Sequence, residues 1–473
     1  MQLFPTSLLV VLALVVLAMR GPQRGFWAFM ALLPFAATAA FNLPAVGGAS
    51  ILLADIGALG IIALLIARPG GTSLLLGTMR LGQPGFWIAL LTVWAIFCTM
   101  AMPRLFAGET LVFSIARAGN ENGVVTSSLR PSTGNLTQLF RHLLGVCIFL
   151  AAATIFRLRP DPGPVITAMA AATGLHIALG VLDVLTYHTG LEALMEPFRT
   201  ANYAILWNHE MIGLKRMIGG FPEASSFGYL SLGLSAVWLH LWLTGVRRRL
   251  SGLLLFATLA CLIHSTSSSA YVGLVAFLSL YGTVRILAGM GRRVSRRGAT
   301  IAGLSLTAAW LGIVALYGAY HFVEPVQAFF DRALFDKLEG ASGQERGSWN
   351  AQALINFADT WGLGAGLGSV RASSWVVAVL ASLGLIGAVL YAGFLRALLL
   401  SRGAWRGEDR QGKVADALRA GCVALLVSAV LTLPTPDLGL AFYAMAGAAA
   451  GLSRGAALAR NAGRTPQALH PAA

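Results

Sequence analysis

Two polar clusters interrupt an otherwise apolar chain, and both carry groups able to bind phosphate. The first runs from Lys215 to Gly228 and holds two cations, one carboxylate and two hydroxyls immediately before an apolar stretch. The planar guanidinium of Arg216 can bind phosphate in bidentate fashion, and Ser225 at a helix start would present its hydroxyl to an anion. This run predicts a site for a charged lipid headgroup. The alternative is a capped helix whose cations rest on lipid phosphates.

The second cluster begins at Arg346 and continues into a glycine-rich stretch over 362–368 that leads to Arg371. The alternating glycines superficially resemble a nucleotide-binding loop. They follow a helical pattern and not a strand, however, so neither a Rossmann fingerprint nor a P-loop is indicated. Because glycine permits close backbone approach, we expect this stretch to admit a bulky substrate and to position Arg371 at the membrane surface.

The elements that must position these clusters are membrane spans. Of the 473 residues, 57% are hydrophobic and 11% are charged, a composition that excludes a soluble protein. The predicted fold class is therefore all-α, a polytopic integral membrane protein with about 13 transmembrane helices (12–14). The expected spans are 3–19, 26–41, 50–67, 86–102, 138–156, 164–187, 226–245, 250–265, 270–288, 299–320, 374–398, 414–433 and 436–452.

The net charge of +15 indicates membrane orientation and not nucleic-acid binding. Basic clusters such as Arg247–Arg249 fall in alternate connections between spans, which places those connections in the cytoplasm. The first helix is then a retained span with its N-terminus outside, and the C-terminus lies in the cytoplasm. Three long segments, 103–137, 188–225 and 321–373, face outward, and function is expected there.

Local patterns predict how these segments fold. Apolar residues at a spacing of four indicate two amphipathic helices on the outer membrane face, at 326–338 and 349–361. Ser348 is the expected N-cap of the second helix and Gly362 its end. The serine-rich break at 265–269 divides the apolar run 250–288 into a hairpin, because one helix of that length is too long for a single crossing.

Two acidic residues of interest inside the expected spans are Asp55 and Asp183, each near an outer end. An acid within a span suggests function, but one so near the edge is as readily a hydrogen-bonded structural residue. Their scarcity weakens a proton-coupled transporter interpretation.

Together these motifs resemble the O-antigen ligase and O-antigen polymerase superfamily over about residues 216–390. The resemblance rests on Arg216, Gly219, Glu223 and Ser225 before one span, the serine-rich break, then Arg346, Trp349 and the glycine-rich stretch ending in Arg371 before Gly384–Gly387. It implies a GT-C-like membrane glycosyltransferase with periplasmic loop helices. Such an enzyme acts at the periplasmic face of the bacterial inner membrane on sugars carried by undecaprenyl pyrophosphate, without metal or other cofactor.

The resemblance also implies residue roles. Arg216 and Arg371 would stabilise the lipid pyrophosphate as catalytic residues, and Glu223 would orient the acceptor hydroxyl or accept its proton. The substrate-binding side chains would be Arg346, Ser225 and Lys215, with Ser225 capping the helix or touching phosphate.

One departure from the family pattern separates the candidate functions. Ligases usually carry a His-Asn pair just ahead of the next span, where this chain reads Arg371-Ala372-Ser373-Ser374-Trp375. This difference favours a polymerase of exopolysaccharide or O-antigen repeat units. The alternatives are a ligase that transfers a lipid-linked glycan to another acceptor and, from another class, a flippase or transporter of lipid-linked sugar.

The expected organisation has N-terminal transmembrane helices over 1–160, a catalytic membrane core over 161–400, C-terminal helices over 401–453 and a disordered cytoplasmic tail over 454–473. The expected partners are undecaprenyl-pyrophosphate-linked oligosaccharide and the lipid bilayer, without nucleic acid. A chain-length regulator and export proteins are further partners open to such an enzyme.

Overall fold

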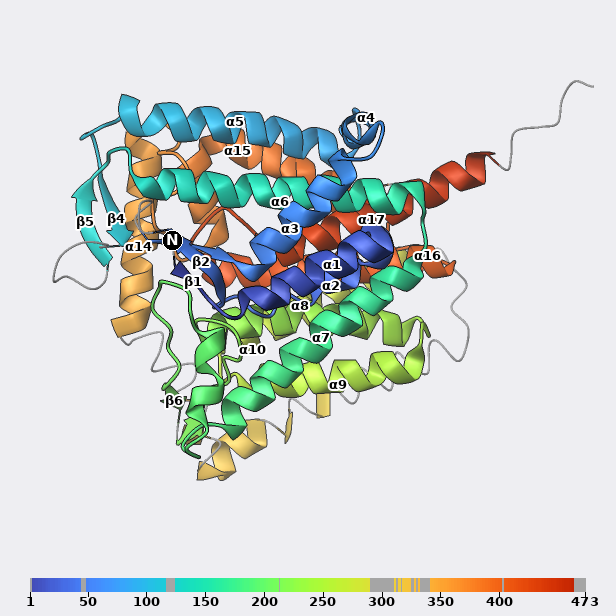
Figure 1. Ribbon diagram of the computed structural model, residues 1–473. Coiled ribbons are helices and arrows are strands. Elements are labelled where there is room, and N and C mark those ends of the chain that lie inside the picture. Colours follow the sequence, from blue (N-terminus) through green and yellow to red (C-terminus); the bar gives the residue numbers. More distant parts are fainter. Residues whose placement is uncertain are drawn as a thin grey trace, which may run out of the picture.

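A computed structural model describes residues 2–43, 48–115, 124–211, 213–289, 310–311, 314–315, 317–324, 327–328, 331, 341–401 and 404–462. Long helices run alongside one another in a bundle, and the short strands gather at one end of it (Figure 1). The helices are α1 (Ser7–Arg24), α2 (Phe26–Met30), α3 (Leu53–Ile66), α4 (Gly71–Leu76), α5 (Pro84–Leu105), α6 (Thr133–Leu158), α7 (Pro162–Leu185), α8 (Ala224–Leu243), α9 (Arg248–His264), α10 (Ser268–Gly289), α14 (Ala341–Asp359), α15 (Trp375–Leu399), α16 (Arg410–Thr432) and α17 (Gly439–Ala462).

The strands form three small antiparallel sheets. β1 (Gln2–Leu3), β2 (Ala39–Leu43) and β3 (Ala49–Leu52) make one sheet, and β4 (Leu111–Ile115) pairs with β5 (Val124–Ser128). β6 (Glu210–Met211) pairs with β7 (Leu214–Lys215) in a short hairpin. Two 3-10 turns, Glu192–Leu194 and Glu196–Phe198, follow α7.

Seven helices of the described residues are long and apolar enough to cross a membrane: α1, α5, α6, α7, α8, α15 and α16. Their outward sides carry large apolar groups, with Val93 67% exposed on α5 and Val389 58% exposed on α15. A continuous apolar belt of this kind needs lipid around it. The chain is therefore an all-α membrane protein, as the composition predicts.

Small residues let the central helices approach closely. α17 packs along α6, and its Gly447 and Gly451 lie so near the backbone of α6 that an added Cβ would come within 2.3 Å of the Phe149 carbonyl and 2.6 Å of the Ala153 carbonyl. Glycines four residues apart lie on one helix face, and in a membrane such a face brings two backbones into contact. α8 packs against α9 and α16 on the other side of the core, and α5 lies along α15.

Several predicted elements need correction. The expected span over 26–41 is wrong, because α2 ends at Met30, Pro34 falls in the turns that follow, and the chain enters β2 at Ala39. The helix expected to begin after Ser348 starts earlier, at Ala341, so Ser348 lies inside α14 and is not its N-cap. The tail expected to be disordered from 454 continues as α17 to Ala462.

One predicted element is confirmed, and two others fall largely outside the part of the chain that the structure describes. The hairpin predicted at the serine-rich break is confirmed, since α9 ends at His264 and α10 begins at Ser268. The expected amphipathic helix at 326–338 and the expected span at 299–320 fall largely outside the described residues.

One end of the bundle carries the elements that hold the candidate site. α14 lies across this end, beside the β4–β5 hairpin, and β6 is at the same end (Figure 1). Side-chain hydrogen bonds fix α14 there: Asn356 Nδ2 donates to Thr110 Oγ1 at 2.8 Å and to the Leu111 carbonyl at 2.6 Å. Gln352 donates to the same carbonyl at 2.8 Å.

Candidate functional site

Arg216 is positioned by the β6–β7 hairpin. Gly213 supplies the positive φ of 71° that this tight turn requires, and the backbone N–H of Arg216 donates to the His209 carbonyl at 3.1 Å. The half-buried Arg216 side chain points to the turn between α9 and α10, where Nη2 donates to the Thr266 carbonyl at 3.5 Å. The serine-rich break therefore lies directly against this arginine.

Asp183, at the C-terminal end of α7, anchors the segment that carries Arg216. Its buried carboxylate accepts the backbone N–H groups of Ile218 at 2.8 Å and Gly219 at 3.0 Å. It also pairs with Arg199 at 2.5 Å and with Lys215 at 3.4 Å. Of the two interpretations open for this acid, the structure supports the hydrogen-bonded structural one.

Lys215 is held within the protein. Its buried Nζ donates to the Arg216 carbonyl at 2.9 Å and lies 5.2 Å from the centre of the Tyr187 ring. Burial lowers the pKa of Lys215, and the Asp183 carboxylate opposes that shift. These contacts assign Lys215 to positioning of the loop instead of to the substrate contact expected from the sequence.

Glu223 stands at the N-terminal end of α8. It is the N-cap residue, although its side chain makes no capping hydrogen bond, and its carboxylate instead accepts a short hydrogen bond from the Ser225 hydroxyl. Ser226 donates to the same oxygen at 3.5 Å. The expectation that Ser225 caps the helix is therefore wrong, because α8 already begins at Ala224. The Ser225 hydroxyl instead donates to the Glu223 carboxylate.

Arg371 is held from α14. Its guanidinium carbon lies 4.2 Å from the centre of the Trp349 ring, a stacking distance at which cation and ring attract one another. Asn350, the next residue of α14, accepts the backbone N–H of Ser373 at 2.7 Å and so ties down the chain just after Arg371. Arg346 lies one helical turn before Trp349 and Asn350 on α14 and is half-buried.

The glycine-rich stretch packs against a break in α15. Gly364 has a φ of +88°, and a Cβ on it would lie 2.5 Å from the backbone nitrogen of Gly384. Here α15 is broken, with Gly384 at φ 67°, and the stretch completes its hydrogen bonds: Ala365 N–H donates to the Ala381 carbonyl and Leu385 N–H to the Gly362 carbonyl. An added Cβ on Gly366 or Gly368 would likewise meet the backbone of α5 or α6, so these glycines let the stretch pack closely against helices just before Arg371.

Electrostatics show that the predicted residues form one cluster. Burial lowers the pKa of both Arg216 and Arg371, and in each case Glu223 is the strongest charge acting against that shift. Arg346 repels both guanidinium groups. Arg216, Arg371, Glu223 and Arg346, four of the six predicted residues, thus lie within electrostatic reach of this cluster, and Ser225 joins them through its hydrogen bond to Glu223.

A pocket of about 280 Å³ has Arg371 among its lining residues. It is formed by the β4–β5 hairpin, the first turns of α6, the end of the glycine-rich stretch and Pro434–Thr435. Its polar lining includes the hydroxyls of Ser132 and Thr137, the amide of Gln138 and a second guanidinium, that of Arg130. Hydroxyl and amide groups around a pocket of this size match the hydrogen-bonding pattern of sugar rings.

Several buried polar atoms at the cluster have no hydrogen-bond partner among the described residues: Nε of Arg216, Nε of Arg371, Oγ1 of Thr266 and Nε2 of His264. Buried donors and acceptors normally find partners, so their concentration here marks a place where a polar ligand fits. Thr266 falls in the serine-rich break predicted from the sequence, but His264, which directly precedes it, was not singled out there. No sequence signal pointed to Asn350 either.

No family model and no curated protein matches this chain. Among the residues that the structure describes, no group of three or more histidine, cysteine, aspartate or glutamate side chains is placed to hold a metal ion.

Proposed function

We propose that this protein is a membrane glycosyltransferase that polymerises undecaprenyl-pyrophosphate-linked repeat units at the periplasmic face of the bacterial inner membrane. The observation that carries the proposal is the convergence of Arg216, Arg346 and Arg371 around Glu223 at one end of an apolar helix bundle. Three cations beside the carboxylates of Glu223 and Glu345 form a net positive site, which suits a pyrophosphate joined to a membrane lipid.

In the proposed reaction the pyrophosphate of the growing chain binds Arg216 and Arg371. A hydroxyl of the incoming repeat unit attacks the anomeric carbon of the sugar that bears the pyrophosphate, and a new C–O bond forms as the bond to the pyrophosphate oxygen breaks. The electron pair leaves with undecaprenyl pyrophosphate, whose charge the guanidinium groups stabilise. The hydroxyl proton passes to Glu223, which Ser225 orients.

The pocket beside Arg371 gives the sugars a place next to this centre. Arg371 lines the pocket and also belongs to the charged cluster, so a ligand that spans both could bind the cluster through its phosphate and the pocket through its sugar. Its hydroxyl and amide lining would bind sugar hydroxyls.

Purified protein in liposomes, supplied with one defined undecaprenyl-pyrophosphate oligosaccharide and no nucleotide, tests the proposal. We expect a ladder of polymer with sugar-to-sugar linkages and release of one undecaprenyl pyrophosphate for each unit joined. Transfer of the glycan only to a foreign acceptor would contradict polymerase activity and indicate a ligase. Movement of the lipid across the bilayer with no new glycosidic bond would contradict both and indicate a flippase.

A further inference from the structure

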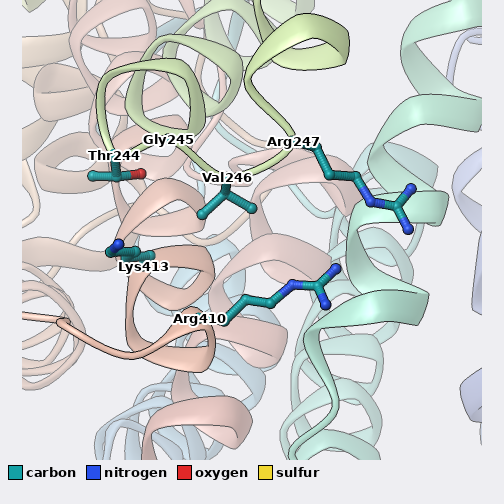
Figure 2. A pocket seen from close by; sticks show the side chains of 6 residues that line it. All are labelled: Thr244, Gly245, Val246, Arg247, Arg410 and Lys413. Atoms are coloured by element: carbon teal, nitrogen blue, oxygen red, sulfur yellow. The ribbon is translucent and has the colours of Figure 1, made fainter.

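A second cationic site lies at the opposite end of the bundle. Thr244–Arg247, in the turn between α8 and α9, faces Arg410 and Lys413 at the start of α16 across a pocket of about 410 Å³ (Figure 2). α8 separates this pocket from Glu223, and its 20 residues span about 30 Å. The pocket is therefore distinct from the candidate transferase site.

The three cations of this pocket lack an acidic partner among the residues that the structure describes. Within the described parts of the chain no carboxylate forms an ion pair with Arg247, Arg410 or Lys413. The nearest acid in sequence, Asp409, is turned away: one of its oxygens accepts the Gly412 N–H at 2.7 Å, and the other pairs with Arg460 at 3.3 Å. Positive charge accumulates in the pocket as a result.

The backbone brings the two arginines of the pocket to the same side of it. Arg247 has a left-handed φ of 44°, a conformation unfavourable for a residue with a Cβ, and it follows Gly245 at φ 77°. In Figure 2 the side chains of Arg247 and Arg410 extend in the same direction from their separate elements, and Lys413 lies beneath Thr244. The start of α16 adds the positive end of its helix dipole to the three side chains.

The surroundings place this pocket at the level of lipid headgroups. Leu243, the last residue of α8, is 53% exposed, and Phe256 on α9 is 64% exposed, so apolar surface for acyl chains lies beside the cations. Trp242 stacks under Arg248 at 5.8 Å, an arrangement typical of aromatic residues at the membrane–water boundary.

We infer that this pocket binds a phosphate group, carried by an anionic lipid or free in solution. Two guanidinium forks and one ammonium supply the donors that phosphate oxygens accept, and basic pockets between spanning helices are known to bind anionic headgroups. The site does not depend on the proposed transferase activity.

Titration of the full-length protein in detergent with dioleoyl phosphatidic acid, followed by native mass spectrometry, tests the inference. The variant carrying Arg247→Gln, Arg410→Gln and Lys413→Gln should bind phosphatidic acid about 100-fold more weakly than wild type. A matched control carries Arg249→Gln, Arg396→Gln and Arg454→Gln, which remove the same charge from exposed positions that do not line the pocket. This control should retain wild-type affinity.

A second titration with inorganic phosphate alone distinguishes the two sources. Selective loss of phosphatidic acid binding in the pocket variant identifies a lipid site. Selective loss of inorganic phosphate binding, with phosphatidic acid unaffected, identifies a soluble phosphate ligand. If the pocket variant and the control bind both probes equally, or if phosphatidylcholine binds wild type as tightly as phosphatidic acid, the inference is overturned.

Discussion

At the scale of single residues, the proposed binding of pyrophosphate depends on how the Arg371 side chain is oriented. The centre of the Trp349 ring lies 4.2 Å from the guanidinium carbon of Arg371, and Asn350 fixes the chain just after it, so both contacts restrict where the guanidinium can lie. A flat, oriented fork can make two parallel hydrogen bonds to one phosphate, which a lysine ammonium cannot. The shape of the side chain at position 371, as well as its charge, should therefore determine how well it binds phosphate.

Arg371→Lys should lower the rate of polymer formation by at least about tenfold, although the positive charge remains. Arg371→Ala should lower it further. The measurement is polymer formed per minute by reconstituted protein, with thermal unfolding as a check that each variant folds. Wild-type turnover in Arg371→Lys would show that the fork is unnecessary.

Trp349→Leu should lower turnover by about 5- to 30-fold, because a partly desolvated cation–π contact contributes on the order of 1–2 kcal/mol. Trp349→Phe restores an aromatic face and should recover most of the loss. A structural role in α14 alone predicts no such difference between leucine and phenylalanine, so equal rates in the two variants would reject the stacking role.

Asp183→Asn should destabilise the fold by about 3–5 kcal/mol, since it removes the countercharge that the described residues give to the half-buried Arg199 and the buried Lys215. Burial already lowers the pKa of Lys215, so the folded state binds fewer protons than the unfolded state between the two pKa values. Stability therefore rises with pH through that interval.

The same substitution lowers the pKa of Lys215 further, which widens the interval. The unfolding midpoint of Asp183→Asn should thus rise more between about pH 7 and pH 9.5 than that of wild type. Adding Lys215→Met should abolish this extra rise. An identical pH response in all three proteins would contradict the assigned pairing.

At the scale of elements, the broken helix α15 and the glycine-rich stretch act as one unit. Gly364→Ala places a Cβ against the backbone of Gly384 at a φ of +88°, so it should cost about 2–4 kcal/mol of stability. The matched control is Gly347→Ala in α14, where an added Cβ meets open space. That control should be neutral or stabilise by about 0.5–1 kcal/mol.

Thermal unfolding in detergent compares the two glycine variants. Equal midpoints would mean that the stretch does not pack on α15 as described.

Elements with local sequence signals could be predicted, whereas contacts between residues far apart in the chain could not. The α9–α10 hairpin and the end of α14 near Gly362 could be predicted because their signals are local, a hydroxyl-rich break and a glycine stop. Pairing of Asp183 with the loop at 215–219 could not be predicted, since it joins residues that no periodicity links. The close approach of Gly364 to Gly384 is likewise a long-range contact, which is why a substrate was expected there.

At the scale of the whole molecule, the two cationic sites lie at opposite ends of one apolar bundle, and in the proposed orientation they face opposite sides of the membrane. Gly347 and Arg249 are both exposed and mark these two ends. With Cys147 changed to alanine, the three remaining cysteines are buried, so single cysteines can report on sidedness.

A membrane-impermeant maleimide applied to intact cells should label Gly347→Cys and leave Arg249→Cys unmodified until the cells are opened. The expected result follows from the positive-inside distribution of arginines. Labelling of Arg249→Cys alone, or of both positions, in intact cells would reverse or reject the proposed topology.

The most direct test of the central claim is the affinity for undecaprenyl pyrophosphate itself, measured on three proteins. We predict that the variant with Arg216→Gln and Arg371→Gln binds it about 100-fold or more weakly than wild type, because two charge-assisted contacts are lost. The variant with Arg249→Gln, Arg396→Gln and Arg454→Gln removes more charge from exposed positions outside both sites and should bind it as wild type does. Undiminished binding by the first variant, or an equal loss in both, would contradict the account.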